Sequence, residues 1–121
     1  MIEQRRFHRV RFTAKSELNH NDITYQGQLE NISLSGALVS CIDGIIVPQG
    51  EECTLTVYLD WENLPLRLVV EIIHASFTMV GMKFVSCDAD TKGRLYKLME
   101  RVTTEPDRLR NELRLLDRES D

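Results

Sequence analysis

The first two thirds of the chain consists of short extended segments separated by turn-forming residues. Between residues 9 and 19, apolar side chains recur mainly at even positions, and charged or polar side chains fill the positions between them. This period of two predicts an amphipathic strand. Residues 19–22 are Asn, His, Asn and Asp, which favour a turn, and residues 23–32 then extend again. The two segments therefore predict a hairpin.

Four further strands are expected after the hairpin, at residues 37–42, 53–59, 66–74 and 77–85. Turn residues rich in Gly, Pro, Asn and Asp separate several of them, at residues 43–44, 48–50 and 63–65. Six short strands with tight connections and no helix between them predict an antiparallel barrel or a sandwich.

The pattern becomes helical at Asp88. Residues 88–91 offer several N-cap candidates and first-turn carboxylates. Apolar residues then follow at helical spacing, at Leu95, Leu98, Met99 and Val102. We expect this surface helix to pack its single apolar stripe against the strands.

A second helical stretch is separated from the first by a break at residues 103–106, because the residue before Pro106 avoids helical angles. The stretch runs from Asp107 to about Arg118 and is mostly charged, with an apolar stripe formed by Leu109, Leu113 and Leu116. So narrow a stripe predicts loose docking on the domain or on a partner, and a tail that is mobile when undocked.

Composition indicates one globular domain. The chain has 121 residues, of which 42% are hydrophobic and 28% charged, values typical of a soluble protein large enough to bury a core. No apolar run approaches the roughly 20 residues that a membrane span needs. Met1 leads into charged residues and not into a signal peptide. We therefore expect a cytoplasmic protein without membrane insertion.

The cysteines and histidines do not indicate a disulfide framework or a metal site. Cys41, Cys53 and Cys87 are odd in number and lie 12 and 34 positions apart, which matches neither disulfide nor zinc-ligand patterns. We interpret all three as reduced core residues. The three histidines share no ligand spacing with one another or with the cysteines, so no metal and no cofactor are expected.

Charge is unevenly distributed along the chain. The net charge is −4, yet residues 1–15 carry five positive charges against one negative charge. An anion that binds here must bind the N-terminal arm, because the protein as a whole repels a long polyanion. This distribution disfavours DNA or RNA as a partner and favours a small anionic ligand.

Two polar clusters are suited to such a ligand. The first is the arginine cluster Arg5, Arg6 and Arg9, whose planar guanidinium groups can each give two parallel hydrogen bonds to a phosphate or to a guanine edge. The second follows the next extended stretch and consists of Asn31, Ser33 and Gly36. The Asn31 amide can both donate and accept hydrogen bonds, and the Ser33 hydroxyl can form one more. Gly36 can adopt a positive φ or let a ligand approach the backbone closely.

These residues carry a resemblance to a known family. The Arg-x-x-x-Arg of Arg5 and Arg9, followed by a hairpin and by the Asn-x-Ser-x-x-Gly of residues 31–36, resembles the PilZ domain family of bacterial cyclic-di-GMP receptors. Residues 81–84, Gly-x-x-Phe, are similar to that family's last barrel strand. The resemblance extends from Arg5 to the final helix, and Asn31 stands where other members carry Asp. It implies a six-stranded antiparallel PilZ-type β-barrel with a C-terminal helix, here in a stand-alone domain.

The expected organisation has three parts. Residues 1–9 form a flexible arm that carries the arginine motif, because Ile2 and Phe7 are its only apolar anchors. Residues 9–104 form the barrel with its packed helix, and residues 105–121 form the charged helical tail. The arm is expected to close over the ligand once the ligand docks on the barrel.

The resemblance implies that Arg5, Arg9, Asn31, Ser33 and Gly36 bind cyclic-di-GMP. Arg6 and His74 are weaker candidates, for a phosphate contact and for stacking on a base respectively. His8 is interpreted only as a spacer between the two arginines.

The implied function is a receptor that converts binding of the second messenger into a conformational change read by a partner protein. The alternative is a nucleotide-independent PilZ-like adaptor that binds proteins. An enzyme is disfavoured, because no nucleophile–base constellation, metal cluster or glycine-rich phosphate loop is recognisable. The partner, the number of nucleotides bound and the oligomeric state stay open.

Overall fold

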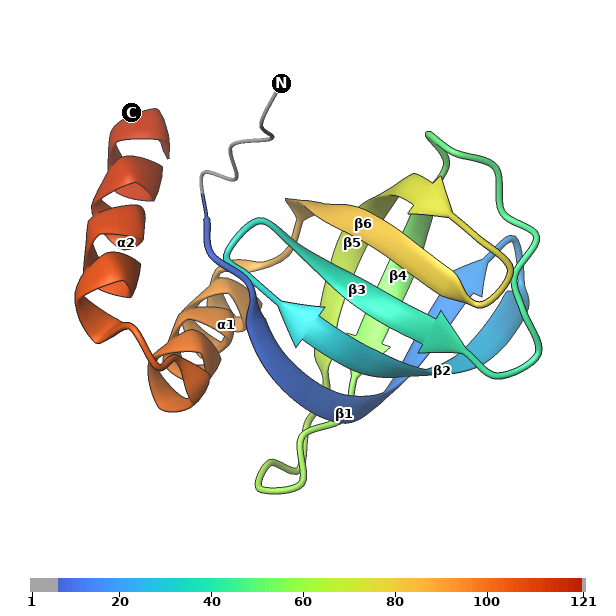
Figure 1. Ribbon diagram of the computed structural model, residues 1–121, viewed down its shortest axis with the longest axis horizontal. Coiled ribbons are helices and arrows are strands. Elements are labelled where there is room, and N and C mark those ends of the chain that lie inside the picture. Colours follow the sequence, from blue (N-terminus) through green and yellow to red (C-terminus); the bar gives the residue numbers. More distant parts are fainter. Residues whose placement is uncertain (1–6, 121) are drawn as a thin grey trace.

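Six antiparallel strands close into a barrel in the computed structural model, which describes residues 7–120, with side chains up to residue 116. The strands are β1 (Val10–His20), β2 (Ile23–Ile32), β3 (Gly36–Cys41), β4 (Glu52–Val57), β5 (Leu66–Ala75) and β6 (Met79–Ser86). They follow one another around the barrel in the order β1-β2-β3-β6-β5-β4, and β4 pairs with β1 to close it (Figure 1). The expected six-stranded antiparallel barrel is confirmed.

The hairpin between β1 and β2 turns at the residues that favoured a turn. His20 pairs with Ile23, so the loop contains only Asn21 and Asp22. Both have positive φ, 49° and 69°, a conformation that Asn and Asp tolerate better than other non-glycine residues. Two consecutive residues with positive φ give the two-residue turn whose twist suits the flanking strands.

The interior of the barrel is filled by apolar side chains. Every strand contributes residues that are at most 1% exposed, among them Leu18, Leu29, Val39, Leu55, Leu68 and Val80. An interior filled in this way is a packed core. A ligand must therefore bind on the outer surface of the barrel or at its ends.

Two strand boundaries differ by two residues from the sequence expectation, and the others by at most one. The sixth strand begins at Met79 and not at residue 77, because the backbone N–H of Ser76 donates to the Met79 carbonyl oxygen at 2.9 Å and closes a turn. Phe77 is left 85% exposed in that turn. The fourth strand ends at Val57, although Tyr58 still donates its backbone N–H to Lys15 at 2.9 Å.

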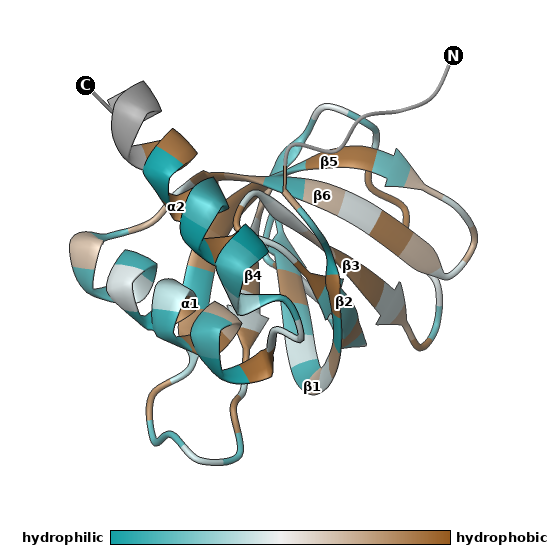
Figure 2. Cartoon of the chain, turned by 60° about the vertical axis from the view of Figure 1, so that its left-hand side comes forward, coloured by the Kyte–Doolittle hydropathy of each residue, from teal (hydrophilic) through white to brown (hydrophobic). Residues whose placement is uncertain are grey.

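Two helices follow the barrel, α1 (Ala89–Val102) and α2 (Pro106–Ser120). Asp88 caps α1, since its side chain accepts the backbone N–H of Thr91 at 2.7 Å. Leu95, Leu98 and Met99 are buried against the strands, as the helical spacing predicted. Both helices lie at the same side of the barrel (Figures 1 and 2). No helix in the described part of the chain is long and apolar enough to cross a membrane.

The second helix docks on the rest of the molecule. Leu109 is 2% exposed, and Leu113 and Leu116 are partly buried against the core. Glu112 lies on the same face and is also buried, with its carboxylate bonded to His8. His8 is thus more than the spacer expected from sequence. Phe7 and His8 are both buried, whereas residues 1–6 lie outside the described residues, so the flexibility of the arm stays a prediction.

Candidate functional site

A cavity of about 420 Å³ lies on the outer surface of the barrel, where the segment before β1 meets the β2–β3 turn and strands β3, β5 and β6. It is lined by Arg9, Ser33, Ser35, Gly36, Leu38, Ile73, His74, Gly81, Met82 and Lys83. The structure therefore brings four residues predicted from sequence to one place, Arg9, Ser33, Gly36 and His74. Arg5 and Arg6 lie outside the described residues.

The turn between β2 and β3 is built around Ser33. The Ser33 hydroxyl oxygen accepts the backbone N–H groups of Ser35 and Gly36, each at 3.1 Å. The Ser33 N–H in turn donates to the Gly36 carbonyl oxygen at 2.9 Å. Ser33 is only 2% exposed, so its hydroxyl shapes the turn, and the exposed neighbour Ser35 presents a hydroxyl at the surface.

Gly36 is required by the packing of two strands. A Cβ atom at this position would lie 2.3 Å from the carbonyl oxygen of Met82 on β6. Gly36 is not among the residues with positive φ, so of the two roles expected for this glycine, a positive φ or a close approach, the positive φ does not apply. The close approach that the glycine permits is between β3 and β6, which places the turn against one wall of the cavity.

Asn31 lies near the end of β2, opposite Arg11 of β1 and Leu38 of β3. It is half-buried and does not line the cavity. Its side-chain oxygen Oδ1 is buried and has no hydrogen-bond partner among the described residues. A buried acceptor without a donor is costly, so this oxygen is suited to accept a hydrogen bond from an additional group.

A bulge in β5 gives the cavity a second wall. The pairing with β6 shifts between Ile72 and His74, which leaves Ile73 as an extra residue. Adjacent strand residues normally point to opposite faces, but a bulge redirects side chains locally. Ile73 and His74 are both exposed and both line the cavity. The His74 ring also lies over Gly81, 3.5 Å from where a Cβ would be.

The charge of the cavity is positive on two sides. Arg9 is contributed by the segment before β1, and Lys83 by β6. The Lys83 ammonium lies 3.7 Å from a Glu71 carboxylate oxygen and is 56% exposed, so the pair is solvated and weak. Leu38 and Ile73 supply apolar surface to the same cavity, whereas Met82, which also lines it, is only 3% exposed. The cavity can therefore accept an anionic group beside a flat apolar group.

Sequence reasoning missed Ser35, Lys83 and the apolar side chains Leu38 and Ile73 of the cavity. Ser35 occupies an unspecified position of the Asn-x-Ser-x-x-Gly motif, and Lys83 an unspecified position of Gly-x-x-Phe. Gly36 pairs directly with Lys83 in the sheet, and Ser35 accepts the Phe84 N–H at 2.8 Å. Ser35 and Lys83 could have been found only from the fact that the two motifs lie side by side in the sheet, and a single sequence does not reveal that pairing.

Comparison with solved structures supports the same architecture. MotI/DgrA, the inhibitor of motility of Bacillus subtilis, is 18% identical with a TM-score of 0.67, over 83% of this chain and 51% of MotI. The PilZ domain of YcgR from Escherichia coli, solved with c-di-GMP, is 12% identical with a TM-score of 0.69, over 83% of this chain and 92% of that domain. The chain thus spans about half the length of MotI and nearly all of the YcgR domain.

A third similar structure is the PilZ domain of CeSA from a cellulose-synthesizing bacterium. It is 22% identical with a TM-score of 0.62, over 75% of this chain and 93% of that domain. At these identities the structures establish a shared fold. Family membership follows from the sequence itself, because the family model described as the PilZ domain matches residues 3–101. This chain belongs to the PilZ domain family.

Proposed function

We propose that this chain is a receptor for cyclic-di-GMP, which it binds in the cavity between Arg9 and Lys83. The observation that carries the proposal is the convergence of Arg9 and the Ser33–Gly36 turn, which are far apart in sequence, on one cavity that is also lined by Lys83 and by apolar side chains. A cyclic dinucleotide has the matching chemistry of two phosphodiester anions and two flat guanine bases. The complex of the YcgR PilZ domain with c-di-GMP adds support at the level of the family.

In this proposal the cations hold the anionic and guanine edges of the ligand. Arg9, and Arg5 with it, give paired hydrogen bonds to a guanine O6 and N7 or to a phosphate. Lys83 acts as a point charge toward a phosphate. Arg6 is a further candidate for a phosphate contact.

The uncharged groups select the base. Ser35 offers its hydroxyl. Asn31 does not line the cavity and its Oδ1 is buried, so it accepts a guanine N–H only after the residues that cover it move on binding. Leu38 and Ile73 cover a base face, and His74 stacks at the rim of the cavity. No step of this proposal changes the nucleotide chemically, so the protein acts as a receptor and not as an enzyme.

The binding event is then passed to a partner protein. The arm that carries the arginines precedes β1, so its ordering on the ligand changes the surface that a partner meets. The ligand shifts the equilibrium between the arrangements of the arm with and without bound ligand contacts only to the extent that it binds one arrangement more tightly than the other. We place this receptor in the cytoplasm.

Titration calorimetry with cyclic-di-GMP tests the proposal, with GTP and cyclic GMP as comparison ligands. Arg9→Ala is expected to weaken binding about fivefold to more than a hundredfold, because one good bidentate contact contributes about 1 to 3 kcal/mol. Arg11→Ala is the matched control, since Arg11 is exposed two residues away and does not line the cavity. Unchanged affinity in Arg9→Ala contradicts the proposed site. Absence of binding to the unmodified chain favours a nucleotide-independent adaptor, and turnover of the nucleotide contradicts the receptor assignment.

A further inference from the structure

A buried hydrogen-bonded pair joins the arginine motif to the last helix. His8 lies between Arg5 and Arg9 in sequence and is 5% exposed. Its backbone N–H donates to Glu112 Oε2 at 2.9 Å, and its ring atom Nδ1 lies 2.8 Å from Oε2 and 2.9 Å from Oε1. The other ring nitrogen, Nε2, lies 2.9 Å from Thr103 Oγ1. Both nitrogens of the ring are thereby engaged, one by α2 and one by the loop between the helices.

Glu112 occupies a position where a charged residue needs a specific reason. Residues 109, 112, 113 and 116 share one face of α2, and Glu112 is 3% exposed among leucines. A buried carboxylate is unfavourable unless charged or polar groups satisfy it. His8 supplies two contacts, and Arg108 Nε lies 3.3 Å from Oε2. The docked position of α2 therefore depends on the hydrogen bonds that His8 forms with Glu112.

The contact also fixes the residue that lines the ligand cavity. His8 is buried and Arg9 is exposed, so the two neighbours point to different sides of the chain just before β1 begins. Phe7, buried at 7% exposure, precedes them in the segment that Glu112 holds. Because the backbone N–H of His8 is itself bonded to Glu112, the bond restrains the main chain next to Arg9 and not only a side chain.

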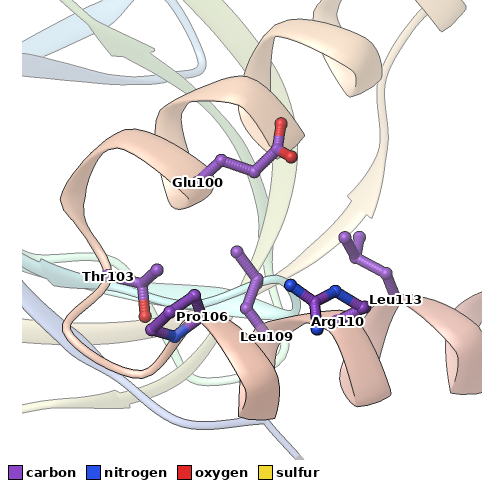
Figure 3. A pocket seen from close by; sticks show the side chains of 6 residues that line it. All are labelled: Glu100, Thr103, Pro106, Leu109, Arg110 and Leu113. Atoms are coloured by element: carbon purple, nitrogen blue, oxygen red, sulfur yellow. The ribbon is translucent and has the colours of Figure 1, made fainter.

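The contact between the two helices is incomplete next to Thr103, the residue that bonds the His8 ring. A cavity of about 240 Å³ separates α1 from α2, lined by Glu100, Thr103, Pro106, Leu109, Arg110 and Leu113 (Figure 3). Glu100 extends from α1 and Leu109, Arg110 and Leu113 from α2 around this space. Loose packing between the helices leaves a larger share of the docking of α2 to Leu109 and to the His8–Glu112 pair.

We propose that Glu112 is a positioning residue for the arginine motif: acting through His8, it holds residues 7–9 so that Arg9 lines the ligand cavity, and it thereby couples docking of α2 to ligand affinity. This inference rests on the proposed function for its ligand. Binding free energies are reciprocal, so the factor by which a docked α2 tightens ligand binding is also the factor by which the ligand tightens docking of α2. A partner that captures α2 then lowers the affinity for the ligand.

A double-mutant cycle separates positioning from a general loss of structure. Cyclic-di-GMP affinity is measured by calorimetry for the full chain and for Glu112→Ala, Arg9→Ala and the double variant. We expect Glu112→Ala to weaken binding about fivefold or more in the unmodified chain, and by less than about twofold when Arg9 is already alanine. Equal weakening in both backgrounds, or unchanged affinity in Glu112→Ala, overturns the proposal.

Two further variants define the chemistry. Glu112→Gln keeps an acceptor for the His8 N–H and is expected to retain part of the affinity that Glu112→Ala loses. Glu105→Ala is the matched control, because it removes the same charge near the start of α2 from a residue whose one ion pair within the described part of the chain, to Arg108 at 3.6 Å, is exposed. Its affinity is expected to equal that of the unmodified chain. Equal affinities of the Gln and Ala variants at position 112 overturn a role for the hydrogen bonds.

Amide hydrogen exchange measured without ligand tests the positioning role of Glu112 independently of whether the protein binds cyclic-di-GMP. In Glu112→Ala the His8 amide is expected to exchange faster, while amides in the centre of β5 and β6 keep their protection. Faster exchange throughout the barrel, or unchanged exchange at His8, overturns the positioning role whatever the ligand is. If exchange responds as expected and cyclic-di-GMP does not bind the unmodified chain, the proposed function fails, and with it the ligand coupling, while Glu112 is still shown to hold residues 7–9.

Discussion

Gly36 of β3 lies so close to Met82 of β6 that an added Cβ atom would be 2.3 Å from the Met82 carbonyl oxygen. That oxygen belongs to the backbone of a paired strand and cannot move aside as the end of a flexible side chain can. The glycine of the binding motif is therefore a requirement of the barrel, and the turn that it ends is held against β6.

Replacing Gly36 with alanine is expected to destabilise the protein. The added methyl group must push β3 away from β6, and such overpacking typically costs about 1 to 3 kcal/mol of unfolding free energy. Urea denaturation followed by circular dichroism measures the change. We also expect weaker ligand binding, because the β2–β3 turn shifts with the strand.

The matched control is Gly93→Ala in α1. Apart from its chain neighbours and the backbone of its own helix, no heavy atom of the described residues lies within 4 Å of the Cβ position of Gly93, and its φ is not positive. Alanine in a helix interior is favoured over glycine by about 0.5 to 1 kcal/mol, so this variant should be more stable than the unmodified protein. Opposite signs at the two glycines are the expected result, and equal destabilisation would contradict the explanation by strand packing.

Replacing Ser33 is expected to lower the stability of the protein, whereas replacing Ser35 is expected to lower its affinity for the ligand. Ser33→Ala leaves the N–H groups of Ser35 and Gly36 without the hydroxyl acceptor that now lies 3.1 Å from each. Leaving such groups unsatisfied costs about 1 to 3 kcal/mol, so thermal or urea unfolding should detect the loss.

Ser35, in contrast, is expected to contribute to ligand affinity and not to stability. Ser35 is exposed, and its hydroxyl makes one weak contact, at 3.3 Å to Ser33. Ser35→Ala should therefore leave the unfolding free energy within about 0.5 kcal/mol and lower the affinity for cyclic-di-GMP in calorimetry. A Ser35→Ala variant with unchanged affinity would remove Ser35 from the proposed site without affecting the role of Ser33.

The strands and the first helix could be predicted because their signal is local and repeated. Alternation around Leu18 and the helical spacing from Leu95 to Met99 each involve several residues that agree with one another. The turn at Asn21 and Asp22 was predictable as well, since those residue types tolerate positive φ. Closure of the barrel was implied by family resemblance, because local patterns fit a sandwich equally well.

The contacts that shape the candidate site were not predictable in the same way. His8 and Glu112 are 104 positions apart, and neither residue alone signals its partner. In α2 the stripe of Leu109, Leu113 and Leu116 was recognised, whereas nothing in the sequence indicated that Glu112 on the same face is buried. The true reason for Gly36 depends on a backbone oxygen of another strand, and the bulge at Ile73 has no local sequence signal.

The cap of α1 gives a pH-dependent contribution to stability. The Thr91 backbone N–H that Asp88 accepts, with the side-chain bond from the same residue, lowers the pKa of the Asp88 carboxyl below its ordinary value. A group with a lowered folded-state pKa stabilises the protein above its unfolded pKa, about pH 4, and loses that contribution as the pH falls through the folded-state value. Thermal unfolding midpoints should therefore decrease below about pH 4 partly through this residue.

Asp88→Asn isolates that effect, because asparagine is an N-cap of similar quality that does not titrate in this range. The variant should unfold near the temperature of the unmodified protein at neutral pH and show a smaller decrease between about pH 4 and pH 2. Asp90→Asn serves as the control, since Asp90 is exposed in the first turn and no cap bond involves it. Parallel pH profiles for Asp88→Asn and the unmodified protein would contradict the assignment.

Lys83 should determine part of the salt dependence of ligand binding. Its ammonium is 56% exposed beside the cavity, so its attraction to a dianionic ligand acts partly through solvent and is screened by salt. Lys83→Ala is expected to weaken cyclic-di-GMP binding at about 50 mM NaCl and to lose less affinity than the unmodified protein when salt is raised to about 500 mM. Lys92→Ala removes the same charge from the exposed face of α1, away from the cavity, and should change neither quantity. Calorimetric titrations at both salt concentrations measure the two slopes. If the slopes of Lys83→Ala and the unmodified chain are equal, Lys83 does not face the anionic part of the ligand, and the anion must be held by the arginine motif alone.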